Sequence, residues 1–281
     1  MSETIVREHS YHAEATVLKG HLRLPFDHEI RPQAHVKLPE SGGYLAQHAC
    51  DYRLESAISF RSAYTQVAGN RDVKPGHGWT ALATSVVEGL NIFDVVTADK
   101  VVGQIATEHP LVGYVPKVTF LGTRFENLRI AGHPVKLDCD LDLFGPKPAN
   151  DAPYTQDPGF ISRVNNQHKQ VREHPSLLEG LIERYTGFPS KIENPEAVEC
   201  SLVNQVEGSF PGRCFGHLIE VPDFGTIVLG ALRLEQSDFH ATTGIPKITT
   251  IHLTMIEFKL GCIAAGNTSL NALVINGHTK P

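Results

Sequence analysis

The sequence predicts a mainly β fold, an antiparallel β-sandwich or flattened barrel with a two-helix insertion around residues 157–187. The clearest observation is the unbroken alternation of apolar and charged residues over residues 135–143. Successive side chains of a strand point to opposite faces, whereas a helix would scatter them around its axis. Similar segments recur before and after residues 145–200, separated by Gly- and Pro-rich turns. Long strands joined by such turns are typical of antiparallel sheets.

The length of 281 residues fits one β-rich domain over residues 1–281, with residues 145–200 as a helical insertion within it. Hydrophobic residues make up 41% and charged residues 20%, which excludes a disordered chain. The net charge of −6, from 25 basic and 31 acidic residues, argues against a nucleic-acid partner.

The start of the chain, MSETIVREHS, lacks the apolar core of a secretory signal. No apolar run approaches the ~20 residues of a membrane-spanning helix, so no transmembrane segment is expected. The cytoplasm is therefore the default localisation; an extracellular one would require a removed leader or a non-classical export route.

The first half of the chain reads as consecutive strands. Leu18, Leu22 and Leu24 alternate with polar residues, and Tyr52, Leu54, Ile58 and Phe60 share a face. The remaining expected strands of this half lie at residues 82–92, 101–107, 118–121, 125–130 and 135–143, with turns at residues 74–78 and 131–134.

Residues 157–187 have the spacing of two helices. Asp157 suits an N-cap and Pro158 the first helical turn. A second apolar stripe follows Pro175 and runs to Tyr185, and a Gly-Phe-Pro stop comes after it. Strand patterns resume at residues 218–221, 226–235 and 249–260. Both faces of the last are largely apolar near its end, which predicts a central strand.

Three aspartates, Asp138, Asp140 and Asp142, are expected on one face of the 135–143 strand. Carboxylates ~7 Å apart along a strand need solvent or a cation such as Ca²⁺. Calcium loops of the Asp-x-Asp-x-Asp type continue with Gly and a curved backbone, but here Leu143 and Phe144 are expected to continue the strand. A solvated sheet face is therefore preferred to a metal site.

Two glutamates, Glu88 and Glu257, have apolar neighbours in sequence. Either could be a buried acid of raised pKa that transfers protons inside a barrel. Strand alternation places both on the less apolar face, so exposure is the preferred interpretation.

Other chemistry-bearing residues are interpreted structurally. Trp79, the single Trp, is expected to cap the core, with ligand stacking as the alternative. The 15 histidines, such as His9, His12, His21, His28 and His35, lack zinc-ligand spacing and are expected on the surface, with a pH-responsive interface as the minority hypothesis.

The five cysteines form no CxxC pair and are expected to be reduced thiols. A bridge between Cys200 and Cys214 is the minority alternative. No Gly-x-Ser-x-Gly, phosphate-loop or thiol-enzyme motif is found, so neither catalytic residues nor a cofactor are predicted.

Three stretches carry a family resemblance: residues 87–91 through 96–99, residues 122–130, and residues 250–254 through 265–267. In this order they resemble the choice-of-anchor P family of bacterial surface β-proteins. The resemblance implies an extracellular β-rich module without catalytic residues. The chain departs from that family in lacking an export signal and in its helical insertion.

Two functions of different classes follow. The first is a non-enzymatic, structural β-rich module that acts through self-association or partner contacts, and a homo-oligomer is expected, since long strands offer edges to another copy. The alternative is a β-barrel that binds a small apolar molecule, as an isomerase or cyclase would.

Overall fold

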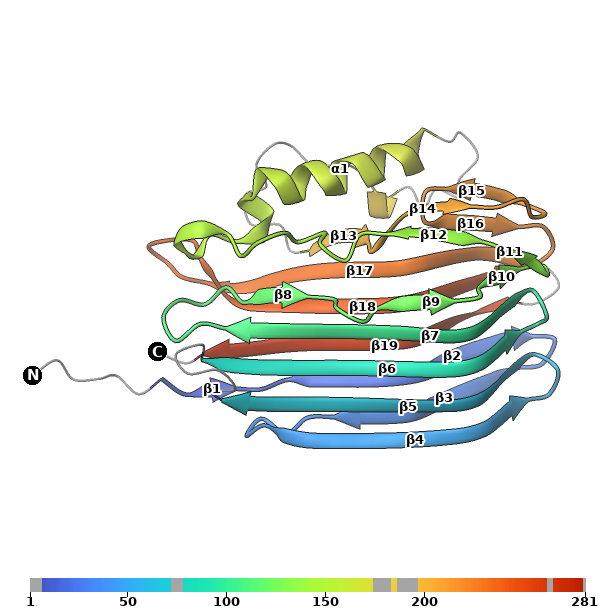
Figure 1. Cartoon of the computed structure of the whole chain (residues 1–281), viewed down its shortest axis with the longest axis horizontal. Helices are drawn as coiled ribbons and strands as arrows, with labels where there is room; N and C mark the ends of the chain where they lie inside the picture. Colours follow the sequence, from blue (N-terminus) through green and yellow to red (C-terminus); the bar gives the residue numbers. More distant parts are fainter. Residues whose placement is uncertain (1–6, 72–77, 174–182, 186–196, 262–264, 280–281) are drawn as a thin grey trace, which may run out of the picture.

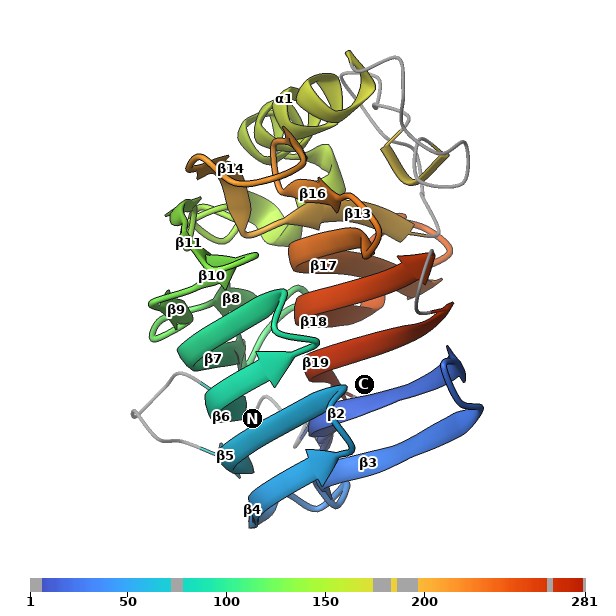
Figure 2. The same cartoon turned by 90° about the vertical axis from the view of Figure 1, so that its right-hand side faces the viewer.

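The computed structural model describes residues 7–71, 78–173, 183–185, 197–261 and 265–279. Its strands form two large antiparallel sheets that lie face to face, and a two-stranded ribbon and a helix lie at one end (Figures 1 and 2). The sheets do not close into a barrel, so of the two predicted architectures the sandwich is the one observed.

The first sheet has nine strands, in the order β15-β16-β17-β18-β19-β2-β3, with β1 and β13 as further partners of β19 and β17. Each neighbouring pair is antiparallel. The strands are β1 (His9–Ser10), β2 (Ala13–Leu24), β3 (His28–Lys37), β13 (Ala197–Ser201), β15 (Arg213–Phe215), β16 (Leu218–Val221), β17 (Gly225–Phe239), β18 (Pro246–Gly261) and β19 (Ala265–Thr279).

The second sheet has eight strands, in the order β11-β10-β7-β6-β5-β4, and β8 and β9 pair with β7. The strands are β4 (Gly43–Leu54), β5 (Ile58–Arg71), β6 (Trp79–Ile92), β7 (Val96–His109), β8 (Lys117–Thr119), β9 (Arg124–Glu126), β10 (Arg129–Ile130) and β11 (His133–Pro134). Chain order and spatial order agree from β4 to β7, as in a meander.

The core lies between the two sheets, where β19 packs over β6 and β7, and β2 packs over β5 and β6. One contiguous cluster of buried apolar side chains from both sheets fills this space, including Leu18, Val87, Ile105, Leu253 and Leu273. Within each strand, successive side chains point alternately into this layer and toward solvent. The predicted central position of residues 249–260 is confirmed, because β18 lies between β17 and β19.

The helical insertion begins as predicted. Helix α1 (Pro158–Arg172) starts after Asp157, whose side chain accepts a hydrogen bond from the amide of Phe160. It lies next to β13, beyond the β17 end of the first sheet (Figures 1 and 2). Most of the predicted second helix and its stop fall outside the described residues. The described part is a 3-10 turn, η3 (Glu183–Tyr185).

Three strand predictions need correction. The strand expected at residues 125–130 is two short strands, β9 and β10. The face shared by Tyr52, Leu54, Ile58 and Phe60 belongs to two strands, because a turn at residues 55–57 separates β4 from β5. The alternating run 135–143 is a strand only at β12 (Lys136–Cys139), which pairs with β14 (Val203–Glu207). Residues 141–144 form turns instead.

No helix within the described part of the chain is long and apolar enough to cross a membrane.

Candidate functional site

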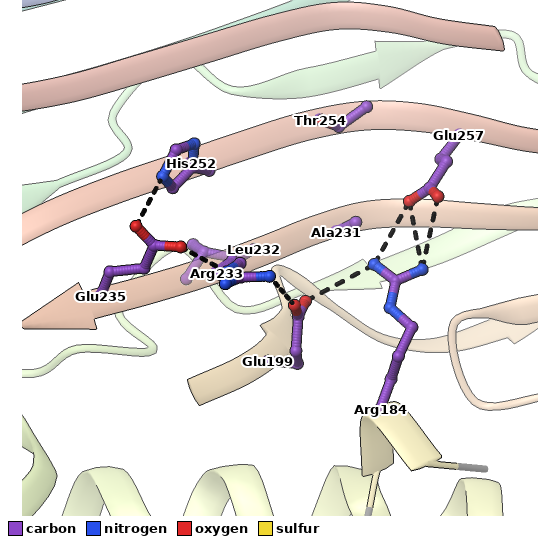
Figure 3. A pocket seen from close by; sticks show the side chains of 9 residues that line it. All are labelled: Arg184, Glu199, Ala231, Leu232, Arg233, Glu235, His252, Thr254 and Glu257. Carbon is purple, nitrogen blue, oxygen red and sulfur yellow. Dashed lines mark hydrogen bonds and ion pairs between the residues drawn. The ribbon is translucent and has the colours of Figure 1, made fainter. Parts of the chain in front are cut away.

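A charged groove of ≈ 400 Å³ lies on the outer face of the first sheet, beside η3 (Figure 3). Strands β17 and β18 form its floor, with Ala231, Leu232 and Thr254 among the lining residues. Six charged or titratable side chains surround these residues: Arg184 of η3, Glu199 of β13, Arg233 and Glu235 of β17, and His252 and Glu257 of β18.

These six side chains form one continuous chain of contacts between acidic and basic groups. Arg184 lies 3.3 Å from Glu257 and 3.5 Å from Glu199. Glu199 is 3.3 Å from Arg233, and Arg233 is 2.7 Å from Glu235. Glu235 lies 3.4 Å from the Nε2 atom of His252 and completes the chain. Every carboxylate of the groove therefore faces a basic side chain.

Residues next to the groove hold η3 against the sheet. Tyr185 is buried in a satellite cluster with Val171, Phe215 and Leu218, and its hydroxyl lies 2.9 Å from His217 Nε2. Burial raises the pKa of Tyr185 and lowers the pKa of His217 to about 3. Tyr185 thus anchors the turn that carries Arg184 to its two glutamates.

The glutamates of this groove are paired with basic side chains. A general acid or base needs a proton-transfer group that is free to reach a substrate and whose pKa is tuned toward neutrality. Here the glutamates are satisfied by guanidinium groups, and the exposed positions allow solvent to screen them. These ion pairs connect η3 and β13 to β17 and β18.

The two glutamates singled out in the sequence lie apart. Glu257 is in the groove, with a side chain 35% exposed, and pairs with Arg184. Glu88 of β6 is on the outer face of the second sheet, 31% exposed, and lies 2.9 Å from Lys100. Hydrogen bonds from Lys100 and Ser62 lower the pKa of Glu88, so the alternative of a buried Glu88 with a raised pKa is wrong.

The three aspartates do not line one strand face. The chain leaves the strand after Cys139, and the Asp140 carboxylate accepts a hydrogen bond from the amide of Asp142 at 3.0 Å. Such a local bond stabilises a turn at the expense of strand pairing. Asp138 remains exposed, with Asn204 Nδ2 3.5 Å from its carboxylate. Among the described residues, no group of three or more His, Cys, Asp or Glu side chains is arranged to hold a metal ion.

Trp79 is buried, as predicted for a residue that caps the core, and stacks on His9 with ring centroids 5.2 Å apart. His9 also lies 4.6 Å from the ring of His109, which is 1% exposed. Burial lowers the pKa of His9 to about 4 and that of His109 well below its ordinary value. The expectation of surface histidines is therefore wrong for part of this set, since the sequence pattern does not show which strands cover His9.

The thiols fit the predicted reduced state. Cys200 and Cys214 are both free, so the alternative of a bridge between them is wrong. Burial raises the pKa of both thiols, which makes them poor nucleophiles. Cys50 is also free and is exposed on β4.

Strand β4 is the outermost strand of the second sheet (Figure 2). Among the described strands it pairs only with β5, which leaves one side of its backbone unpaired. Nearly all its residues are exposed, including Tyr44 at 64% and Leu45 at 42%. Leu45 lies opposite the buried Val67 of β5, so it points to the core side of the sheet without being covered.

Sequence reasoning did not single out this edge, and its composition is unusual. Residues 43–50, GYLAQHAC, contain no Lys, Arg, Asp, Glu or Pro. The corresponding edge strand of the first sheet, β3, carries Glu29, Arg31, Pro32 and Lys37. Charges and Pro on an edge strand prevent pairing with other chains. The edge at β3 is protected in this way, whereas residues 43–50 of β4 are not.

Comparison with known proteins gives one match. Residues 9–235 match the family described as Domain of unknown function (DUF8256). No curated protein and no solved structure matches the chain. The family match covers all of the second sheet and much of the first. The chain therefore belongs to the DUF8256 family.

Proposed function

We propose that this protein is a non-enzymatic β-rich module that acts by self-association through the free edge of β4. The observation that carries the proposal is the uncharged, exposed segment 43–50 at the end of a sheet. An unpaired strand edge presents a row of N–H and C=O groups that another strand can satisfy. A second copy supplies a strand of the same length and composition.

The geometry also limits the assembly. An edge that pairs with itself around a two-fold axis forms a closed, isologous contact. The neighbouring edge at β3 is charged and contains Pro32, so it does not offer a second such contact. The proposed assembly is therefore a dimer in which two eight-stranded sheets continue into each other, rather than an open fibre.

The barrel alternative has less support. A ligand barrel needs an enclosed cavity lined by apolar and a few polar groups. The sheets of this chain stay open at their edges, and buried side chains from both sheets pack against one another between them. The charged groove lies outside this core.

Sedimentation velocity of the full chain tests the proposal. The wild type should sediment as a dimer over a concentration series, and Leu45→Lys should shift it to the monomer, because the ammonium would have to be desolvated in the pairing. Leu121→Lys is the matched control, since Leu121 is 71% exposed at a position away from β4. A wild type that is monomeric throughout the series, or a dimer unaffected by Leu45→Lys, would refute the proposal.

A further inference from the structure

The faces of β4 define how a second copy can pair with it. Leu45, Gln47 and Ala49 lie opposite Val67, Thr65 and Ala63 of β5, which are buried against the core. These three β4 residues therefore point to the core side of the sheet, and Tyr44, Ala46 and His48 point to the outer side. The regular alternation ends at Asp51, whose φ of 52° lies in the left-handed region.

A two-fold antiparallel pairing must bring residues of the same face opposite each other. The symmetry axis therefore passes through a residue and not between two residues. Only two axes pair all but one residue of the regular segment 43–50. An axis at Gln47 pairs residues 44–50, and an axis at Ala46 pairs residues 43–49.

The side chains favour the axis at Gln47. With this axis, Leu45 lies opposite the partner's Ala49 on the core side, so two apolar contacts form and the uncovered Leu45 is shielded. With the axis at Ala46, Leu45 would lie opposite a Gln47 amide. That register would also use Gly43, whose φ of 113° departs from an extended strand.

We infer that two copies of this chain join through an antiparallel β4–β4 pair centred on Gln47. The inference rests on the proposed function and adds its register. The amides of the two Gln47 side chains meet at the axis, where each can donate to the other. Tyr44 lies opposite the partner's Cys50 on the outer side.

Disulfide trapping of the full-length protein tests this register. In a Cys50→Ser background, Gln47→Cys places two thiols directly opposite, at Cα atoms ~5 Å apart, which suits a disulfide. Ala46→Cys is the matched control. In this register Ala46 lies opposite His48 of the other copy, so the Cα atoms of the two Ala46 residues are about 8 Å apart, too far for a disulfide. We expect Gln47→Cys to form a reducible dimer at least about tenfold faster than Ala46→Cys. In a protein that keeps the native Cys50, the thiol of Tyr44→Cys should form a disulfide with Cys50 of the other copy as fast as Gln47→Cys links to itself.

The results of disulfide trapping and sedimentation together distinguish a wrong register from a wrong proposed function. Faster linking of Ala46→Cys than of Gln47→Cys would overturn the register and leave self-association through β4 standing. A wild-type dimer in sedimentation with none of these pairs linked would place the interface elsewhere and refute both. A monomeric wild type refutes the proposed function, and the register falls with it. Leu121→Cys in the same background measures linking by random collision and should match Ala46→Cys.

Discussion

Asn271 connects the two sheets in the middle of the core. Its side chain is fully buried, accepts a hydrogen bond from Ser85 Oγ of β6 at 2.9 Å, and donates one to the Val101 carbonyl of β7 at 2.9 Å. Its own backbone, in β19, has a φ of 50°. Asn is one of the few residues that tolerates this left-handed conformation. Asn271 therefore supplies a hydrogen-bond partner to two buried polar groups and also adopts the left-handed conformation that the strand needs at this position.

Replacing Asn271 with Ala should be among the more costly single changes in the chain. The Ser85 hydroxyl and the Val101 carbonyl would each lose a buried partner, at about 1–3 kcal/mol apiece. Ala in the left-handed region adds about 1 kcal/mol. Because the Ser85 hydroxyl can rotate toward another acceptor, we expect a total loss of about 3–5 kcal/mol in the free energy of unfolding. Asn271→Gly should lose about 1 kcal/mol less, since Gly accepts the φ angle.

Urea denaturation at one fixed protein concentration measures these losses. The fluorescence of Trp79, the single and buried Trp, reports unfolding. Asn127→Ala is the matched control, because Asn127 also has a positive φ, of 51°, but is exposed and bonds only to exposed Asp99 in the described part of the chain. The control should lose no more than about 1–2 kcal/mol. A loss below ~1 kcal/mol for Asn271→Ala, or one equal to the control, would refute this account of the bridge.

Two further predictions concern titratable groups. Since burial lowers the pKa of His9 to about 4 and of His217 to about 3, the unfolded chain binds protons that the folded chain does not. Their contribution to stability is full above the unfolded pKa of 6.5 and is lost as the pH falls from there toward 3. The free energy of unfolding in urea should therefore fall between pH 7 and pH 4 by about 3 kcal/mol per histidine, or about 6 kcal/mol for the two together, and a flat profile would contradict this assignment. Glu88→Gln should change the free energy of unfolding by less than about 1 kcal/mol, because its pair with Lys100 is partly open to solvent. A larger loss in the same assay would show that the pair contributes to the stability of the fold.

The strand pattern predicted the β-rich class and many of the strands, but it missed β3, β19 and residues 43–50 of β4, and it did not show every turn. β6, β17 and β18 were predicted because their inner faces are apolar over many residues. The turn at residues 55–57 was not, since Tyr52 lies opposite Phe60 and Leu54 opposite Ile58 in the β4–β5 hairpin. Residues that pair across a hairpin share a face, so the alternation continues through the turn and conceals it.

The groove was not predicted from the sequence, because its residues are far apart in the chain. Glu257 was recognised from its apolar neighbours, but its partner Arg184 is 73 residues away in the chain. Similarly, the alternation at residues 135–143 contains no sign that Asp140 caps a turn. Local periodicity reports which face a residue takes, whereas pairing of distant side chains depends on the order of strands in the sheet.

The composition of residues 43–50 is unusual only because the strand order places β4 at the edge of its sheet. The strand pattern of the sequence does not single out GYLAQHAC, and an uncharged strand is usually found inside a sheet, where neighbours satisfy both sides of its backbone. The structure places this segment at an edge, while β3, the edge beside it, has the charges and the Pro that normally keep an edge free. An edge strand with the composition of an interior strand lacks one neighbour. Because its face pattern is compatible with itself in antiparallel register, a second copy can be that neighbour without any change in the fold.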